Sequence, residues 1–104
     1  NIFAINEGEY FNPFWALEER GKGTSLHNHK WVLYDNIIVS RNMLPTVEGV
    51  KGLRIVRIDS RHYGEIYKKN FMMEKGAPKR SYYGNNFQNG YSDHLPVLIK
   101  INDR

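Results

Sequence analysis

Asp93 and His94 are the residues whose types and position suggest chemistry most directly. They lie in the run Ser92–Pro96, which reads Ser-Asp-His-Leu-Pro and leads into the apolar residues 97–99. This pattern places a carboxylate and an imidazole at the start of a strand, where a rigid scaffold can hold catalytic groups carried by a loop. Neighbouring residues of an extended segment point in opposite directions, so Asp93 and His94 can serve separate partners.

Asp35 is the expected partner of His94. It lies within the apolar run Trp31–Val39, which is predicted to be a central strand, on the same side as Leu33 and Ile37. Burying a carboxylate without a partner costs several kcal/mol, so a partner is required. A structural carboxylate bound by loop N–H groups is one interpretation. The other is a carboxylate that holds an imidazole through one nitrogen and leaves the second oriented for acid–base work.

Two further strands and several loops are expected around these residues. Alternating apolar and charged residues predict a strand over Leu53–Ile58 with one solvated side, and Leu95–Ile101 is the predicted last strand. The remaining segments are predicted as a loop over Asn1–Ala16, a short helical turn over Leu17–Arg20, a surface loop over Gly21–Lys30, a loop with a short helix over Tyr63–Glu74, and a long irregular segment over Gly76–Gly90.

Length and composition indicate one folded domain or part of one. The chain has 104 residues, of which 40% are hydrophobic and 13% aromatic, which is too apolar for a disordered chain. The formal charge of +4 favours an anionic partner only weakly. The absence of cysteine excludes a disulfide framework and a thiolate zinc site. No apolar run approaches the roughly 20 residues of a membrane-spanning helix, and the compartment stays open.

Two motifs carry a family resemblance. Gly90-Tyr91-Ser92-Asp93-His94-Leu95-Pro96-Val97 and, about sixty residues earlier, Asp35-Asn36-Ile37-Ile38-Val39-Ser40 resemble motifs of the endonuclease/exonuclease/phosphatase superfamily. That superfamily includes deoxyribonucleases, abasic-site endonucleases, sphingomyelinases and inositol-polyphosphate phosphatases. Trp31 and the Tyr82-Tyr83-Gly84 run resemble the corresponding segments of bacterial members, so the resemblance extends from about Asn12 to Ile101.

The resemblance implies a fold class and a place within it. The expected class is α+β, here the C-terminal part of a two-sheet α/β sandwich (four-layer αββα in the full family fold), built mainly of β-strands with long loops. The family's upstream motifs, namely a metal-binding Glu, an Asn, a further His and an Asp-x-Asn, are not recognisable, because Glu7, Glu9, Glu18 and Glu19 lack the strand context. Residues 1–104, which begin with Asn1 rather than Met, are therefore expected to be the C-terminal portion of a single domain.

The resemblance also implies a reaction, the hydrolysis of a phosphodiester or phosphomonoester by a divalent-metal-dependent phosphoesterase. By resemblance, His94 contacts the scissile phosphate and acts as acid or base on the attacking water, Asp35 orients His94, and Asp93 helps to hold Mg²⁺ or Mn²⁺. One carboxylate does not complete a cation site, so the isolated chain is expected to be inactive. The substrate stays open between nucleic acid, a lipid headgroup and a small molecule, and substrate-binding residues are not identified.

A noncatalytic binding or assembly module that retains the sheet is the alternative function. Strands separated from a larger sandwich expose apolar faces and edges, so self-association of the piece is expected in either case. The missing N-terminal half of the domain is the expected partner within the same protein.

The other candidate groups have simpler interpretations. The His27-Asn28-His29 run is interpreted as a polar loop and His62 as a surface residue. The basic residues are interpreted as solvated charges that could also steer an anionic substrate, and the aromatic ones as core residues that could also stack on a base. The basic residues are Lys68, Lys69, Lys79, Arg80, Arg54 and Arg57, and the aromatic residues are Trp31, Tyr82 and Tyr83.

Overall fold

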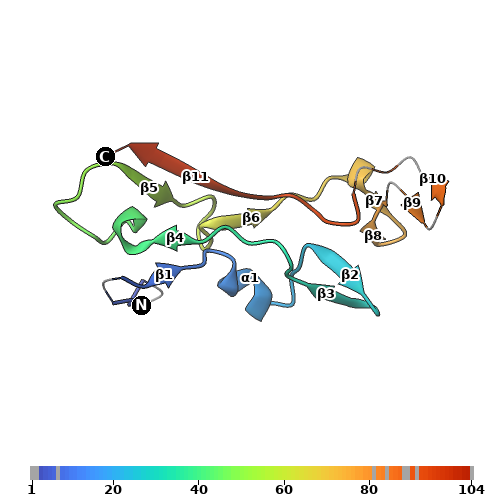
Figure 1. The fold of residues 1–104 in the computed structure, drawn as a ribbon, viewed down its shortest axis with the longest axis horizontal. Helices are drawn as coiled ribbons and strands as arrows, with labels where there is room; N and C mark the ends of the chain where they lie inside the picture. Colours follow the sequence, from blue (N-terminus) through green and yellow to red (C-terminus); the bar gives the residue numbers. More distant parts are fainter. Residues whose placement is uncertain are drawn as a thin grey trace.

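Short β-strands dominate the computed structural model, which describes residues 3–6, 8–80, 82–83, 85–87, 90 and 92–103 (Figure 1). The elements in chain order are β1 (Tyr10–Phe11), α1 (Trp15–Glu19), β2 (Ser25–His27), β3 (Lys30–Val32), β4 (Val39–Ser40), a 3₁₀ turn (Arg41–Met43), β5 (Leu53–Val56), β6 (Gly64–Ile66), a second 3₁₀ turn (Asn70–Met72), β7 (Met73–Glu74), β8 (Ala77–Pro78), β9 (Tyr82–Tyr83), β10 (Asn86–Phe87) and β11 (Val97–Asp103).

The long strand β11 organises the largest sheet. It lies between β5 and β6 and pairs with both in antiparallel register, with Ile101 opposite Ile55 and Ile99 opposite Gly64. Gly64 lets the segment before α1 pack closely on this sheet, since a Cβ at this position would lie 2.9 Å from the Phe14 ring. Phe14 is fully buried as a result.

The core lies between this sheet and the β1–β4 pair. Phe11 of β1 pairs with Val39 of β4, and both side chains are buried with Ile55, Tyr63 and Leu44 in one cluster. Figure 1 shows β1 and β4 running along one side of the sheet, with α1 beyond β1. This packing fixes the end of the segment that carries Asp35, because β4 follows that segment directly.

The predicted central strand over Trp31–Val39 is only partly correct. Strand pairing is present at its two ends, in β3 and β4, while residues 33–38 join no ladder in the described part of the chain. The two-residue alternation nevertheless persists, because Leu33, Asp35 and Ile37 are half-buried and Tyr34 and Ile38 are exposed. The backbone is thus extended there without a hydrogen-bonded neighbour among the described residues.

The surface loop predicted over Gly21–Lys30 is wrong, because β2 and β3 form a hairpin there. His27 pairs with Lys30, so the turn has two residues, and both Asn28 and His29 have positive φ, at 49° and 65°. Left-handed conformation at both central positions is the geometry that suits the twist of a two-residue hairpin. The run read as a polar loop is therefore the end of a hairpin.

The remaining element predictions were mostly correct in type and displaced at their ends. Strand β5 ends at Val56 rather than Ile58, β11 starts at Val97 rather than Leu95, and α1 starts at Trp15 rather than Leu17. The loops predicted at the start of the chain and over 63–74 also contain the short strands β1, β6 and β7, and the irregular segment 76–90 contains β8, β9 and β10. Glu7, Ser81, Gly84 and Tyr91 lie outside the described residues.

The molecule is elongated and open. Its extents are 53 × 25 × 24 Å and its radius of gyration is 16.3 Å, whereas a compact domain of this length has a radius near 13 Å. The accessible surface of 7501 Å² also exceeds the roughly 6,000 Å² of a compact monomer of this mass. Tyr10, Trp15, Tyr34 and Ile38 are each more than half exposed.

The fold is therefore mostly β-strands in small antiparallel sheets with one short helix, and its place in a two-sheet sandwich stays a prediction. No helix in the described ranges is long and apolar enough to cross a membrane.

Candidate active site

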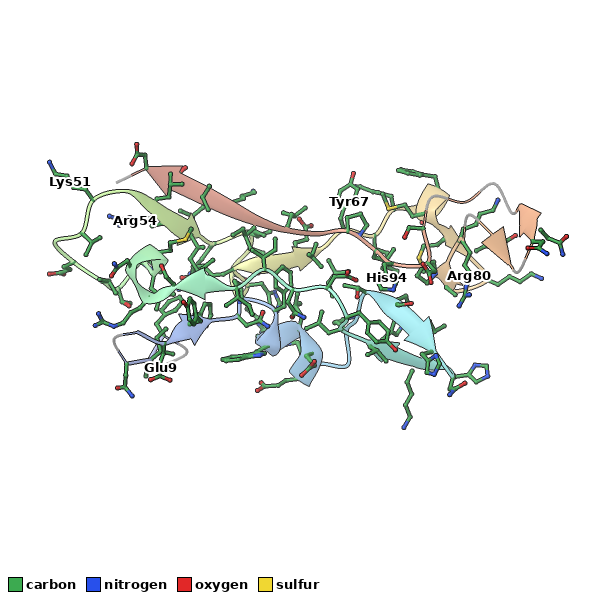
Figure 2. All side chains as sticks on the ribbon, in the orientation of Figure 1. Glu9, Lys51, Arg54, Tyr67, Arg80 and His94 are labelled. Carbon is green, nitrogen blue, oxygen red and sulfur yellow. The ribbon has the colours of Figure 1, made fainter. Side chains whose placement is uncertain are left out.

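Asp35 and His94 come together although 59 residues separate them in sequence. The Nδ1 atom of His94 lies 2.7 Å from Oδ2 of Asp35, which is within the range of a short charge-assisted hydrogen bond. The His94 side chain is 39% exposed and the Asp35 side chain is 41% exposed. The pair therefore lies at the surface, where a ligand can reach it. Figure 2 shows His94 beside the β2–β3 hairpin.

The partner of Nδ1 determines which nitrogen of His94 is available. An ionised carboxylate only accepts hydrogen bonds, so Nδ1 carries the ring proton and its N–H donates a hydrogen bond to Asp35. The Nε2 atom then holds the lone pair of the neutral ring and is the atom that can accept a proton from water or from a substrate hydroxyl. The geometry prepares an oriented acid–base group.

Backbone contacts hold the loop that carries His94. The backbone N–H of His94 donates to Oγ of Ser92 at 3.1 Å, which closes a tight turn. The next residue, Leu95, is 2% exposed and anchors the loop in the interior. Pro96 then accepts a hydrogen bond from the Tyr67 N–H at 2.8 Å. The Ser-Asp-His-Leu-Pro run therefore forms a turn with a buried anchor directly before β11.

Thr24 and Ser25, which the sequence interpretation placed in a surface loop, join the two halves of the site. The Thr24 hydroxyl accepts the backbone N–H of Tyr34 at 3.1 Å, and its carbonyl accepts the N–H of Leu95 at 2.6 Å. The Ser25 hydroxyl donates to the carbonyl of Asp93 at 2.8 Å. Both residues are buried, at 0% and 6% exposure. We call these two residues the Thr24–Ser25 clamp.

Gly23 explains how the clamp reaches its position. A Cβ on Gly23 would lie 2.6 Å from the backbone nitrogen of Val32, so only glycine permits this close approach of the two chains. The N–H of Thr24 then donates to the Val32 carbonyl at 2.9 Å. A glycine directly before two small hydroxyl residues was the available signal, but the polar character of the segment favoured a loop.

Tyr34 is a second contributor that sequence reasoning did not identify. Its ring stacks on the His94 imidazole, with ring centroids 5.4 Å apart and an interplanar angle of 18°. Asp35 therefore holds His94 at its edge, and the preceding residue covers one face of its ring. This restricts rotation of the imidazole beyond what the single hydrogen bond achieves.

Asn12 fixes the chain just after Asp35. It is 8% exposed, and its Nδ2 donates to Oδ1 of Asn36 at 2.9 Å. Its own Oδ1 accepts the N–H of Phe14 at 2.9 Å. The segment of Asp35 is thereby tied to the start of α1.

Asp93 lies beside the pair as an exposed residue. Its carboxylate oxygens are suitable ligands for a hard cation. The described residues contain no group of three His, Cys, Asp or Glu side chains that could hold a metal ion. The residues present fit one ligand of a cation site and do not fit a complete one.

The prediction that His62 is a surface residue is wrong. Its side chain is 13% exposed, and its Nδ1 lies 3.0 Å from Oδ2 of Asp59. Donation from the backbone N–H of Arg61, followed by donation from the His62 ring, lowers the pKa of Asp59 to about 2. The three-residue spacing of Asp59 and His62 was the available signal for this second Asp–His pair.

The remaining candidates have less direct roles. His27 and His29 lie at the hairpin end and belong to no group of three potential metal ligands among the described residues. The Lys68 and Lys69 ammonium groups each lie 5.3 Å from a ring centroid, those of Trp31 and Tyr67. The side chains of Tyr82 and Tyr83 lie outside the described part of the structure.

Comparison with known proteins gives one result that covers nearly the whole chain. The model of the Endonuclease/Exonuclease/phosphatase family matches residues 4–103. No curated protein and no solved structure matches the chain.

Proposed function

The chain belongs to the Endonuclease/Exonuclease/phosphatase family, and we propose that it forms the acid–base part of a phosphoesterase active site. Membership implies a hydrolase of the phosphoesterase type, and enzymes of this family typically use a divalent metal. We further propose roles for three residues. His94 is the acid or base that acts on the attacking water, Asp35 orients it, and Asp93 is a metal ligand.

The observation that carries the proposal is the 2.7 Å contact between His94 and Asp35. Hydrolysis of a phosphoester requires a water aimed in line and a group that takes its proton. Asp35 stabilises the imidazolium that forms when Nε2 of His94 takes this proton. The Tyr34 ring and the Thr24–Ser25 clamp keep the imidazole in one orientation.

The proposed cation, Mg²⁺ or Mn²⁺, requires ligands beyond Asp93. When bound, a divalent cation neutralises charge on the phosphoryl oxygens. Because the described residues offer no complete ligand set, the other ligands must come from the proposed N-terminal half of the domain. The isolated chain is accordingly proposed to be inactive.

The shape of the molecule supports the proposal that residues 1–104 are the C-terminal portion of a two-sheet sandwich. Tyr34 and Ile38 alternate outward from the segment that carries Asp35 and are 52% and 61% exposed. Tyr10, which is opposite Ser40 in the β1–β4 pair, is 65% exposed on the neighbouring strand. A second sheet that covered these side chains would remove apolar surface from water.

The same exposed side chains support a second candidate function, a noncatalytic binding or assembly module. This candidate keeps the sheet and requires no ligands from elsewhere. The two functions differ in one feature: the enzyme requires a Glu-bearing strand and an Asp-x-Asn motif in the preceding sequence, and the module does not.

A substrate panel tests the proposed function. The full-length protein that carries these residues is assayed against DNA, an aryl phosphodiester and an inositol phosphate, each with and without Mg²⁺. The proposal expects Mg²⁺-dependent hydrolysis of at least one substrate, and the identity of that substrate sets the class. Absence of hydrolysis from all three, by a folded protein with Mg²⁺, would support the noncatalytic module instead.

A further inference from the structure

A cavity of about 360 Å³ lies between α1, β3 and β6, and its lining includes Leu95 but neither Asp35 nor His94. We call it the Trp31 cavity, because the Trp31 indole forms one wall. Leu17, Ile66 and Leu95 supply apolar lining. Its volume is within the range of about 300–1,000 Å³ that small-molecule sites occupy.

Three basic side chains line the same cavity, from two parts of the chain. Arg20 and Lys22 follow α1, and Lys68 follows β6. None of them forms an ion pair with another residue in the described part of the chain. The Lys68 ammonium group lies over the Trp31 ring, 5.3 Å from its centroid. A ligand in this cavity would meet cationic groups and an aromatic surface at the same place.

The two acidic side chains of the cavity, Asp59 and Glu65, offset this charge only in part. Asp59 already accepts the N–H groups of Arg61 and His62, each at 2.8 Å, together with the His62 ring. Its charge is therefore satisfied locally. The His62 side chain also lines the cavity, while its Nε2 atom is buried away from solvent and has no hydrogen-bond partner among the described residues.

We propose that the Trp31 cavity binds a nucleotide-type ligand, meaning an organic anion that joins a flat unsaturated ring to a phosphate. The Lys68 ammonium group moves from the face of the Trp31 ring to the phosphate when the ligand binds, and the flat ring of the ligand then stacks on the indole in its place. Arg20 and Lys22 offer further charge-assisted hydrogen bonds to the phosphate. The ligand is either a free mononucleotide or one nucleotide unit of a nucleic acid strand. This site is separate from the Asp35–His94 pair and does not depend on hydrolysis there.

Trp31 fluorescence measures this binding directly. The chain contains two tryptophans, so the titrations use a Trp15→Phe background in which Trp31 is the remaining indole. The probes are adenosine 5′-monophosphate, adenosine, inorganic phosphate and a short single-stranded oligonucleotide. We expect saturable quenching by adenosine 5′-monophosphate, with adenosine and phosphate each binding about tenfold more weakly because each lacks half of the interaction.

The oligonucleotide arm separates the two sources of the ligand. Tighter binding of the oligonucleotide than of the mononucleotide indicates a strand, and equal or weaker binding indicates a free nucleotide. No saturable response to adenosine 5′-monophosphate would overturn the proposal. Phosphate that binds as tightly as the mononucleotide would also overturn it, because the ring would then contribute nothing.

Two neighbouring lysines provide a matched pair of variants. Lys68→Gln is expected to weaken binding of adenosine 5′-monophosphate about tenfold. Lys69→Gln removes an ammonium group at the same 5.3 Å from a ring, that of Tyr67, but outside the cavity lining, and is expected to leave binding unchanged. Equal effects of the two variants would contradict the proposed location.

Asp35→Asn separates this inference from the proposed function. It is expected to leave the fluorescence titration unchanged while it lowers any hydrolysis. Hydrolysis is measured on the full-length protein, since the isolated chain is proposed to be inactive. Mononucleotide binding by the chain without phosphoester hydrolysis by the full-length protein would support this site and refute the phosphoesterase role. Hydrolysis by the full-length protein without mononucleotide binding would refute this site and support the phosphoesterase role.

Discussion

Asp35 and Asp59 each hold a histidine through its Nδ1 atom, at 2.7 Å and 3.0 Å, but the two pairs depend on the fold to different degrees. Asp59 and His62 are three residues apart, so a local turn is enough to join them. Asp35 and His94 are 59 residues apart and meet only when β4 and β11 are in place. The His94 ring is also three times more exposed, at 39% against 13%. Of the two pairs, the one at His94 is therefore both fold-dependent and accessible to a substrate.

Asp59 gives a prediction for the pH dependence of stability. Its folded pKa is about 2, below the usual 3.8. The unfolded chain therefore binds this proton first as pH falls. The stabilising contribution is fully present above pH 3.8 and is lost as the pH falls toward 2.

Asp59→Asn keeps the side-chain oxygen that accepts the backbone N–H groups and removes the charge. The free energy of unfolding of the wild type and of this variant, measured by urea denaturation from pH 6 downward, should differ most above about pH 4. The difference should shrink toward pH 2. A difference that is constant over this range would show that the charge of Asp59 has no part in stability.

At the scale of residues, the sequence predicted some contributors to the site and missed others. Asp35 was predicted from the cost of burying a carboxylate in an apolar run, and that premise was wrong because its side chain is 41% exposed. His94 was predicted from its place before a strand. Tyr34 and the Thr24–Ser25 clamp were missed because their roles depend on contacts between segments distant in sequence, which no local pattern records. The catalytic roles of Asp35, Asp93 and His94 stay predictions.

At the scale of elements, the β2–β3 hairpin has an unexpected role, because the clamp lies at the start of its first strand. Thr24, directly before β2, holds the Asp35 segment through its hydroxyl and the His94 loop through its carbonyl. The hairpin is therefore the element that sets the distance between the two halves of the site.

Thr24→Val tests this role. Valine has nearly the same shape as threonine but no hydroxyl, so the Tyr34 N–H loses its acceptor, at a cost of about 1–3 kcal/mol. Thr24→Ser is the matched control, since it keeps the oxygen. Urea denaturation should show a lower midpoint for the valine variant than for the serine variant. Equal midpoints would show that the hydroxyl does not hold the Asp35 segment.

The elements differed in how far local patterns predicted them. Strands β5 and β11 were predicted because apolar alternation or an apolar run is a local signal. The β2–β3 hairpin was missed because Asn28 and His29 adopt left-handed backbone conformations that glycine usually marks. Residues 33–38 were predicted to pair in a sheet and do not pair with any described residue. Pairing requires a neighbouring strand, and the apolar pattern of a segment does not show whether one is present.

At the scale of the whole molecule, the open shape predicts self-association of the 104-residue chain. Tyr10, Tyr34 and Ile38 are exposed to more than half, and apolar surfaces of this kind associate in water. Light scattering coupled to size-exclusion chromatography should show species larger than a monomer at micromolar concentration.

Ile38→Lys should shift this equilibrium toward the monomer, because a charge within the interface costs more than it gains. Asn102→Lys adds the same charge at an exposed position on β11 and should leave the distribution unchanged. A wild-type chain that is monomeric at all concentrations would show that this face does not associate on its own.

His94 is proposed to perform acid–base chemistry on a phosphoester. The most direct measurement compares kcat for an aryl phosphodiester, with Mg²⁺, between His94→Ala and His27→Ala in the full-length protein. His27 is an exposed histidine at the hairpin end and serves as the matched control. Loss of a positioned acid–base group lowers the rate about 10²–10⁴-fold, so His94→Ala should lose this much while His27→Ala keeps the wild-type rate. Hydrolysis at the wild-type rate by a folded His94→Ala protein would contradict the account.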